Sequence, residues 1–252
     1  MIDTHTHLFH EKFDADRDEA VARAVAAGVE EMLLPNIDAS TVDAMLVLAD
    51  AHPAHCRPML GLHPTSVGAD VREQLAALEA RLGERAWAAI GEIGTDLYWS
   101  EEFWDEQREA FRTQCAWAIG LGLPVSVHCR ASIDETLAMV EPLAARGLRG
   151  VLHCFTGTVA QAERAVAAGF YLGIGGLLTY GQPDVRDVAA AVPRDRVVAE
   201  TDSPFLAPVP RRGRRNESAY LPLVVERLAG VWGVSVAEAD AITTANARQL
   251  FG

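Results

Sequence analysis

Lysine is almost absent from this sequence. Of its 252 residues only Lys12 is a lysine, and 22 basic against 35 acidic residues give a net charge of −13. So acidic a chain is not expected to coat nucleic acid or anionic lipid. Chemistry on a phosphate is not excluded, because a bound metal ion can supply positive charge at one place.

Cysteines and long apolar runs are also scarce. The four cysteines form no CxxC pair, no signal peptide opens the chain, and no apolar run approaches the length of a membrane span. We therefore expect a reduced, cytoplasmic protein without membrane contact, whose cysteines mostly fill the core. No obligate protein partner is implied, and we expect a monomer.

Short apolar runs alternate with longer runs of helical period along the whole chain. The runs that predict strands begin near Met1, Val29, Arg57, Trp87, Pro124, Arg149, Phe170 and Arg196. Helices are predicted over residues 14–27, 39–51, 71–82, 102–121, 133–146, 159–168, 185–191, 217–229 and 237–250. Eight βα units of about 28 residues favour an α/β fold, a (β/α)8 TIM barrel formed by residues 1–252 as one domain.

Polar and ionisable residues gather at the carboxyl ends of the predicted strands. In a barrel these ends form one surface, which carries the active site. A doubly wound sheet would concentrate them near a single switch point instead. The glycines at 173, 175 and 176 lack the spacing of a GxGxxG motif, so a dinucleotide site is not expected.

Four histidines are candidate metal ligands. His5 and His7 end the first predicted strand two residues apart, so both imidazoles can face the same side. His128 and His153 end the fifth and sixth strands, and each is followed by a cysteine that the alternation turns toward the helices. A single strand-end histidine is commonly structural, but four that converge on one barrel mouth predict a divalent metal centre.

Carboxylates complete the predicted site. Glu92 lies in an apolar run, where it needs a cation or an ion pair, for which Arg130 is the alternative partner. Asp202 ends the eighth strand, where it can bind metal and take a proton from water, or cap the following segment. Glu200 is expected one layer deeper, and Asp3 either orients a ligand histidine or faces a buried neighbour.

These residues together predict a two-metal hydrolase. His5, His7 and Asp202 would hold one ion, and His128 and His153 would hold the second. Glu92 would bridge both ions, because the chain has no lysine there to form a carboxylated bridge. Nitrogen and oxygen ligands allow zinc, manganese or magnesium. His63, at the end of the third strand, could bind substrate or move a proton.

Basic and aromatic residues near the same face bear on the substrate. Arg130 follows His128 and is placed to reach an anion. Arg212 belongs to a loop with four arginines, which could clamp phosphates or could simply be a solvated loop. Tyr98, Trp99 and Phe155 follow strands, where they could stack on a base or plug a loop onto the barrel.

The motifs resemble those of the TatD family of metal-dependent hydrolases. The resemblance runs in order along nearly the whole chain, through MIDTHTHL, GLHP, AIGEIGTD, PVSVHCR, GVLHCFTG, AETDSPFLAP and RGRRNESAYL, with Asn246. It implies an amidohydrolase-like barrel with one or two divalent ions, held by His5, His7, Glu92, His128, His153 and Asp202, with His63 lining the site. Departures such as Thr95 and Ser132 fall beside these ligands and bear on substrate preference.

Three functions are compatible with such a site. The first, which the resemblance implies, is a deoxyribonuclease that cleaves phosphodiester bonds from the 3′ end, and the acidic charge favours a strand end over an extended duplex. The second is an amide or ester hydrolase such as a D-aminoacyl-tRNA deacylase, which the same ligands would serve. The third, an inactive barrel used as a scaffold, is disfavoured by the complete ligand set.

Overall fold

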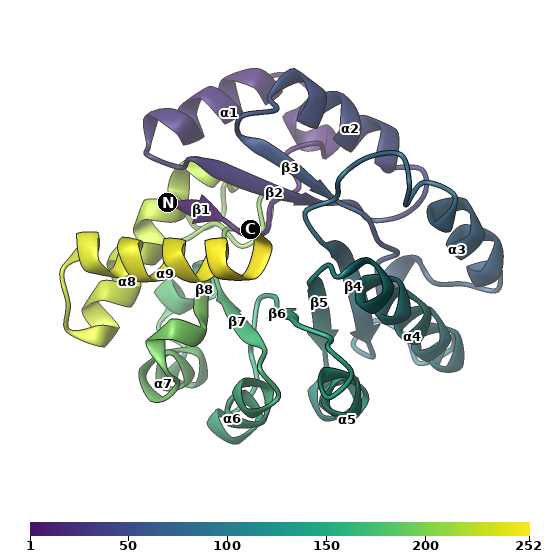
Figure 1. Cartoon of the computed structure of the whole chain (residues 1–252). Helices are drawn as coiled ribbons and strands as arrows, with labels where there is room; N and C mark the ends of the chain where they lie inside the picture. Colours follow the sequence, from purple (N-terminus) through teal and green to yellow (C-terminus); the bar gives the residue numbers. More distant parts are fainter.

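Eight parallel strands form the centre of the molecule in the computed structural model, which describes residues 1–252 (Figure 1). They are β1 (Ile2–Asp3), β2 (Glu31–Pro35), β3 (Cys56–Met59), β4 (Ile90–Asp96), β5 (Val125–Arg130), β6 (Gly150–Leu152), β7 (Tyr171–Ile174) and β8 (Val197–Ala199). Hydrogen bonds join β1 to β3 in order and β4 to β8 in order. Bridges from Leu60 to Ile90 and from Thr6 to Ser203 join the two sheets at both edges. The strands therefore close into a ring, which confirms the (β/α)8 barrel.

Helices surround this ring (Figure 1). They are α1 (Arg17–Ala26), α2 (Val42–Ala51), α3 (Val71–Glu79), α4 (Trp104–Leu121), α5 (Ile133–Ala144), α6 (Val159–Ala167), α7 (Pro183–Ala191), α8 (Leu221–Trp232) and α9 (Val236–Phe251). Short 3-10 turns are η1 (Glu11–Phe13), η2 (Pro64–Ser66), η3 (Gly176–Tyr180), η4 (Arg194–Arg196) and η5 (Ser218–Tyr220). No single helix is long and apolar enough to cross a membrane, and only the segments 218–232 and 236–251, bent by 107°, reach that length and hydropathy together.

Apolar side chains fill two regions. The larger lies between the strands and the outer helices, and it contains Cys56, Cys115 and Cys129 as predicted. The smaller joins Leu33 of β2 and Val198 of β8 with apolar residues at the carboxyl end of α9. Because strands buried on both faces need apolar residues at nearly every position, the short strands read as continuous hydrophobic runs.

Helix α9 closes the amino end of the barrel. Leu250 and Phe251 pack into its apolar cluster, and the Asn246 side chain donates a hydrogen bond of 2.7 Å to the carbonyl of Val197, where β8 begins. Arg57 on β3 donates to the carbonyl of Phe251 at 2.9 Å, which satisfies one of the free carbonyls at the helix end. The carboxyl ends of the strands remain for the functional site.

Candidate metal centre

A pocket of about 780 Å³ opens at the carboxyl ends of the strands. Side chains from opposite sides of the ring line it, including His7, His63, Glu92, Asp96, His128, His153 and Asp202. Five of the six predicted metal ligands are among them, and the sixth, His5, lies fully buried in contact with them. The structure thus brings the predicted ligands together at one site.

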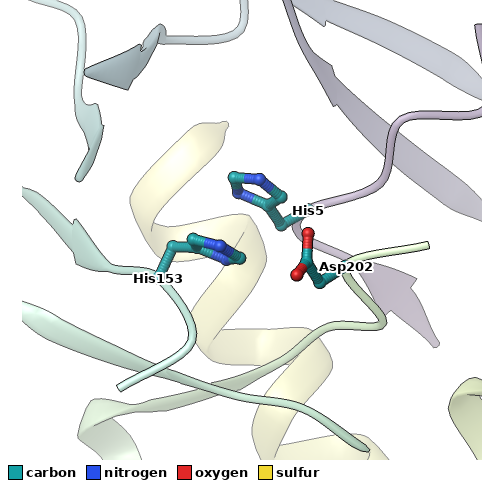
Figure 2. Close-up of side chains that lie close together, drawn as sticks. All are labelled: His5, His153 and Asp202. Atoms are coloured by element: carbon teal, nitrogen blue, oxygen red, sulfur yellow. The ribbon is translucent and has the colours of Figure 1, made fainter. Parts of the chain in front are cut away.

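His5, His153 and Asp202 come from three separate segments, after β1, β6 and β8. Figure 2 shows their side chains turned toward one another. The rings of His5 and His153 stack with centroids 3.4 Å apart and planes 13° apart. Asp202 joins them in a group whose ligand atoms all lie within 4.8 Å of one another.

Glu92 is the centre of the site. Its Oε2 lies 3.1 Å from Nε2 of His5 and 3.6 Å from Nε2 of His7. Its Oε1 lies 3.1 Å from Nδ1 of His128 and 3.6 Å from Nε2 of His153. The carboxylate therefore lies between two pairs of histidines, as the bridging role requires. The alternative ion pair with Arg130 is wrong, because that guanidinium is exposed and stacks on an aromatic ring.

The other nitrogen of each of these four histidines has a partner outside the cluster. The partners, with their distances, are Ser126 Oγ at 3.2 Å from His5, the Pro35 carbonyl at 3.1 Å from His7, Asp96 Oδ2 at 2.9 Å from His128, and Glu200 Oε1 at 2.9 Å from His153. Since a carbonyl only accepts, His7 donates from Nδ1 and keeps a lone pair on Nε2. Outer partners that orient the ring and fix its tautomer are typical of metal-ligating histidines.

His63 differs from the other four histidines. Its Nε2 lies 3.3 Å from Oε1 of Glu92, so it reaches the same cluster. Its Nδ1, however, accepts a hydrogen bond of 3.1 Å from the backbone N–H of Thr65. The neutral ring must then carry its proton on Nε2, where it donates to Glu92 instead of offering a lone pair. This geometry favours the predicted proton-transfer or substrate role of His63 over that of a ligand.

Asp96 is a site residue that the sequence reasoning missed. One of its oxygens holds His128, and the other accepts hydrogen bonds from the backbone N–H groups of Tyr98 and Trp99 at 2.9 and 3.3 Å. The signal was available, because Asp96 lies four residues after Glu92 on the same strand, and the alternation of a strand turns both to one side.

The two deeper carboxylates have different neighbours. Glu200 lies beside His153, although Nδ1 of that ring lacks an aligned hydrogen bond and Glu200 Oε2 has no partner. A Cβ at Gly173 would lie 2.2 Å from this oxygen, so glycine is needed there. Asp3 does not touch an imidazole. It accepts from the backbone N–H and the hydroxyl of Thr201 at 2.9 and 2.6 Å, which fixes the segment that carries Asp202.

Burial sets the charge state of the cluster. It lowers the pKa of His7 to about 4, so this ring is neutral at pH 7. Burial, with repulsion from Glu92 and Glu200, raises the pKa of Asp202 to about 7 although His153 opposes the shift. Burial also disfavours the charged form of His153, but Glu200 and Glu92 outweigh it and raise that pKa to about 10. The buried carboxylates thus crowd one another, and the positive charge that they favour on His153 offsets only part of their repulsion.

The donor set fits a divalent metal ion. Neutral imidazole nitrogens and carboxylate oxygens are the ligands that such ions take, and a buried cation would relieve the repulsion between the carboxylates. Besides His5–His153–Asp202, three groups bring their ligand atoms within 4.8 Å of one another, namely His5–His7–Glu92, His63–Glu92–His128 and His153–Cys154–Glu200. Glu92 belongs to the first two of these groups, which suits a bridge.

Cys154 does not pack against the helices as expected. It has a left-handed backbone with φ of 46°, it lines the pocket, and its backbone N–H donates to Glu200 Oε1 at 2.6 Å. The alternation of a strand no longer applies because β6 ends two residues earlier. Cys129 also borders the pocket, but it belongs to the larger apolar core.

The arginines of the last loop do not form one clamp. Arg215 pairs with Asp16 and Glu217 at the side of the barrel. Arg212 stacks over Tyr180 with its guanidinium carbon 4.4 Å from the ring centroid, outside the pocket lining. Arg130, by contrast, lines the pocket itself. Of the two predicted substrate contacts among the arginines, only Arg130 lies at the cluster.

This chain is similar in sequence and in fold to known proteins. The family model of the TatD related DNases matches residues 2–252. The chain is 33% identical to the uncharacterized metal-dependent hydrolase YabD of Bacillus subtilis and 35% identical to the 3′-5′ ssDNA/RNA exonuclease TatD of Erwinia tasmaniensis, covering all of this chain and 98% and 99% of those proteins. Among solved structures, the TatD homolog YJJV of Escherichia coli superposes with a TM-score of 0.90 at 31% identity over all of this chain and 97% of that one.

Proposed function

Because the chain belongs to the TatD-related DNase family of metal-dependent hydrolases, we propose that it is a divalent-metal-dependent phosphodiesterase that removes nucleotides from the 3′ end of single-stranded nucleic acid. One observation carries the proposal. Four histidines point their inner nitrogens at one buried carboxylate, and their outer nitrogens are hydrogen-bonded in three of them and lie beside Glu200 in the fourth. This arrangement costs free energy unless a cation occupies it, so a structural role alone does not account for it.

The protein's own residues have separate tasks in this proposal. His5, His7, His128, His153, Glu92 and Asp202 would hold the metal. A bound divalent ion would neutralise charge on the phosphate and make a water molecule more acidic. Asp202 accepts the proton of the attacking water, and His63 donates from Nε2 to the leaving oxygen. Arg130, which lines the pocket without a carboxylate partner, binds the phosphate.

The depth of the site favours the free end of a nucleic-acid strand as the substrate. His5 is fully buried and Glu92 is 2% exposed, so a scissile phosphate must descend to the floor of the pocket. An unpaired end can enter such a pocket, whereas a duplex is too broad and stiff. The relatives named 3′-5′ ssDNA/RNA exonuclease support this substrate class. An aminoacyl ester would have to reach the same depth, but its leaving group differs from that of a phosphodiester. Activity measurements separate the two substrates.

The test is hydrolysis of a short 5′-labelled single strand by the purified chain with Mg²⁺, Mn²⁺ or Zn²⁺. We expect a ladder that shortens one nucleotide at a time from the 3′ end. Asp202→Asn, purified in the same way, controls for contaminating nucleases. Arg130→Ala should slow this reaction at least tenfold, whereas Arg212→Ala should change it little. Cleavage of D-aminoacyl-tRNA with no attack on the oligonucleotide would contradict the proposal and support the deacylase.

A further inference from the structure

The exposed aromatic side chains of this protein are confined to one place. Three residues among the phenylalanines, tyrosines and tryptophans are exposed: Tyr98 at 57%, Trp99 at 70% and Phe205 at 39%. Trp99 and Phe205 line the pocket above the metal centre, and Tyr98 adjoins Trp99. Exposed aromatic rings are costly in water, so their concentration at one mouth points to a ligand with apolar faces.

Trp99 and Phe205 lie on opposite sides of the mouth. Trp99 follows β4 and Phe205 follows β8. Strands four and eight are across from each other in a closed ring of eight in chain order (Figure 1). A chain that crosses the pocket therefore passes one ring before the metal centre and the other ring after it.

Each aromatic site also has a cation. The guanidinium carbon of Arg130 is 3.7 Å from the ring centroid of Tyr98 and 5.5 Å from that of Trp99. Nζ of Lys12, the single lysine of the chain, is 4.8 Å from the ring centroid of Phe205. Neither cation is in an ion pair. An exposed aromatic ring with an unpaired cation over it offers a surface for a base and a positive charge for a phosphate, which are parts of the repeating unit of a nucleic acid.

The segment that carries Tyr98 and Trp99 is connected to the candidate metal centre through Asp96. The carboxylate of Asp96 holds the backbone of Tyr98 and Trp99 with one oxygen and the ring of His128 with the other. Phe155, the third aromatic residue expected near the mouth, is 2% exposed and serves packing only. The exposed Tyr98 and Trp99 are therefore held in place by Asp96 and do not pack a loop onto the barrel.

We infer that Trp99 with Arg130, and Phe205 with Lys12, are two stacking sites that hold the bases on either side of the scissile phosphate. The inference rests on the proposed function and adds to it the residues that select unpaired bases. A base in a duplex has its faces covered by its neighbours and its edge paired, so neither ring could reach it. Stacking is tolerant of base identity, because every base has an aromatic face.

The test combines changes in the protein with changes in the substrate. KM and kcat are measured for Trp99→Leu, Trp99→Phe and Phe205→Leu on a single strand, and on strands in which the last or the preceding nucleotide carries a tetrahydrofuran in place of its base. Val47→Ala, an equally exposed site on α2, is the control. We expect each leucine variant to raise KM about 5- to 150-fold, the range of base–aromatic stacking, with kcat changed less. Trp99→Phe should keep most of the affinity.

The stacking partners are identified by non-additivity. Once the matching base is removed from the strand, Trp99→Leu or Phe205→Leu should raise KM no further. KM values equal to that of Val47→Ala, or full additivity of ring and base removal, would overturn the inference while leaving nuclease activity intact. A wild-type chain that attacks no oligonucleotide with any metal would instead refute the proposed function and this inference with it.

Discussion

The two ends of the barrel are built from the same eight strands but differ in every other respect. At the amino end, Leu33 and Val198 meet Leu250 and Phe251 of α9 in an apolar cluster. At the carboxyl end, the strands present histidines and carboxylates to a pocket open to solvent. One end buries apolar area, which stabilises the fold, and the other buries polar groups, which does not.

Backbone strain follows the same division. The four non-glycine residues with positive φ are Ala131, Cys154, Asp202 and Leu206. All four follow the carboxyl ends of β5, β6 or β8, and none lies at the capped end. Strained residues at a functional site persist only where the rest of the fold holds them. Stability should therefore depend mainly on the amino end and the proposed activity on the carboxyl end, and substitutions should separate the two.

The largest expected effect is on activity at the carboxyl end. Asp202→Asn removes the proposed proton acceptor and a metal ligand, so kcat/KM should fall by about 10³-fold or more. The metal-free variant should nevertheless be at least as stable as the wild type. Both quantities are measured on one preparation, by oligonucleotide hydrolysis and by urea unfolding.

The stability of Asp202→Asn depends on pH in a defined direction. The pKa of Asp202 is raised from 3.8 to about 7, so the folded metal-free chain binds this proton more tightly than the unfolded chain does. Its contribution to stability therefore falls as pH rises from about 4 to 7, and the loss is complete above pH 7. The variant should therefore become more stable relative to the wild type as the pH rises from about 4 to 7. A variant that is active, or that is destabilised equally at all pH values, would contradict the assignment.

The next largest effect is on stability at the amino end. Leu250 is 2% exposed in the apolar cluster, and Leu250→Ala should lower the free energy of unfolding by about 3 kcal/mol. KM and kcat of the folded fraction should stay within a factor of two or so, because Leu250 lies at the opposite end of the barrel from the predicted ligands. Val236→Ala, at an exposed position of the same helix, is the control. A fall in kcat that matches the loss of stability would show that the ends are coupled.

Adding a metal ion should stabilise the protein only through the carboxyl end of the barrel. An ion that binds only the folded chain stabilises it by about 2.7 kcal/mol at a free concentration 100 times its Kd. Thermal unfolding after dialysis against EDTA, with and without Zn²⁺ or Mn²⁺, measures this shift. Leu250→Ala should show the same shift as the wild type, and Glu92→Gln should lose most of it. An unchanged shift in Glu92→Gln would exclude Glu92 as a ligand.

What could be predicted from the sequence follows from regular structure. Every strand begins within three residues of its predicted start, and the predicted ligands at strand ends converge because parallel strands place their carboxyl ends on one face. Apart from Asp96 on β4, the features that were missed depend on loops. Cys154 turns toward the pocket through a left-handed backbone, Arg215 is drawn away from the mouth by Asp16, and the exposure of Phe205 depends on the path of the loop after β8.

The smallest predicted effect concerns an uncharged part of the carboxyl end. Thr95 and Ser132 both depart from the motifs that the sequence resembles, and their hydroxyl oxygens lie 2.7 Å apart in a fully buried group with Thr136. The two departures therefore act as a pair. Thr95→Leu removes one hydrogen bond from each partner hydroxyl and adds volume, so it should cost about 2 kcal/mol of unfolding free energy.

A double-mutant cycle tests whether Thr95 and Ser132 as a pair stabilise the fold at the carboxyl end of the barrel. Ser132→Ala should be less costly on the background of Thr95→Leu than alone, with a coupling of about 1 kcal/mol in urea unfolding. Thr95→Val, which removes the hydroxyl without added volume, separates the lost hydrogen bond from overpacking. Activity should change less than stability in all three variants, because Asp96 and not Thr95 holds His128. Strict additivity would mean that the two departures are independent, and that the carboxyl end takes no stability from them as a pair.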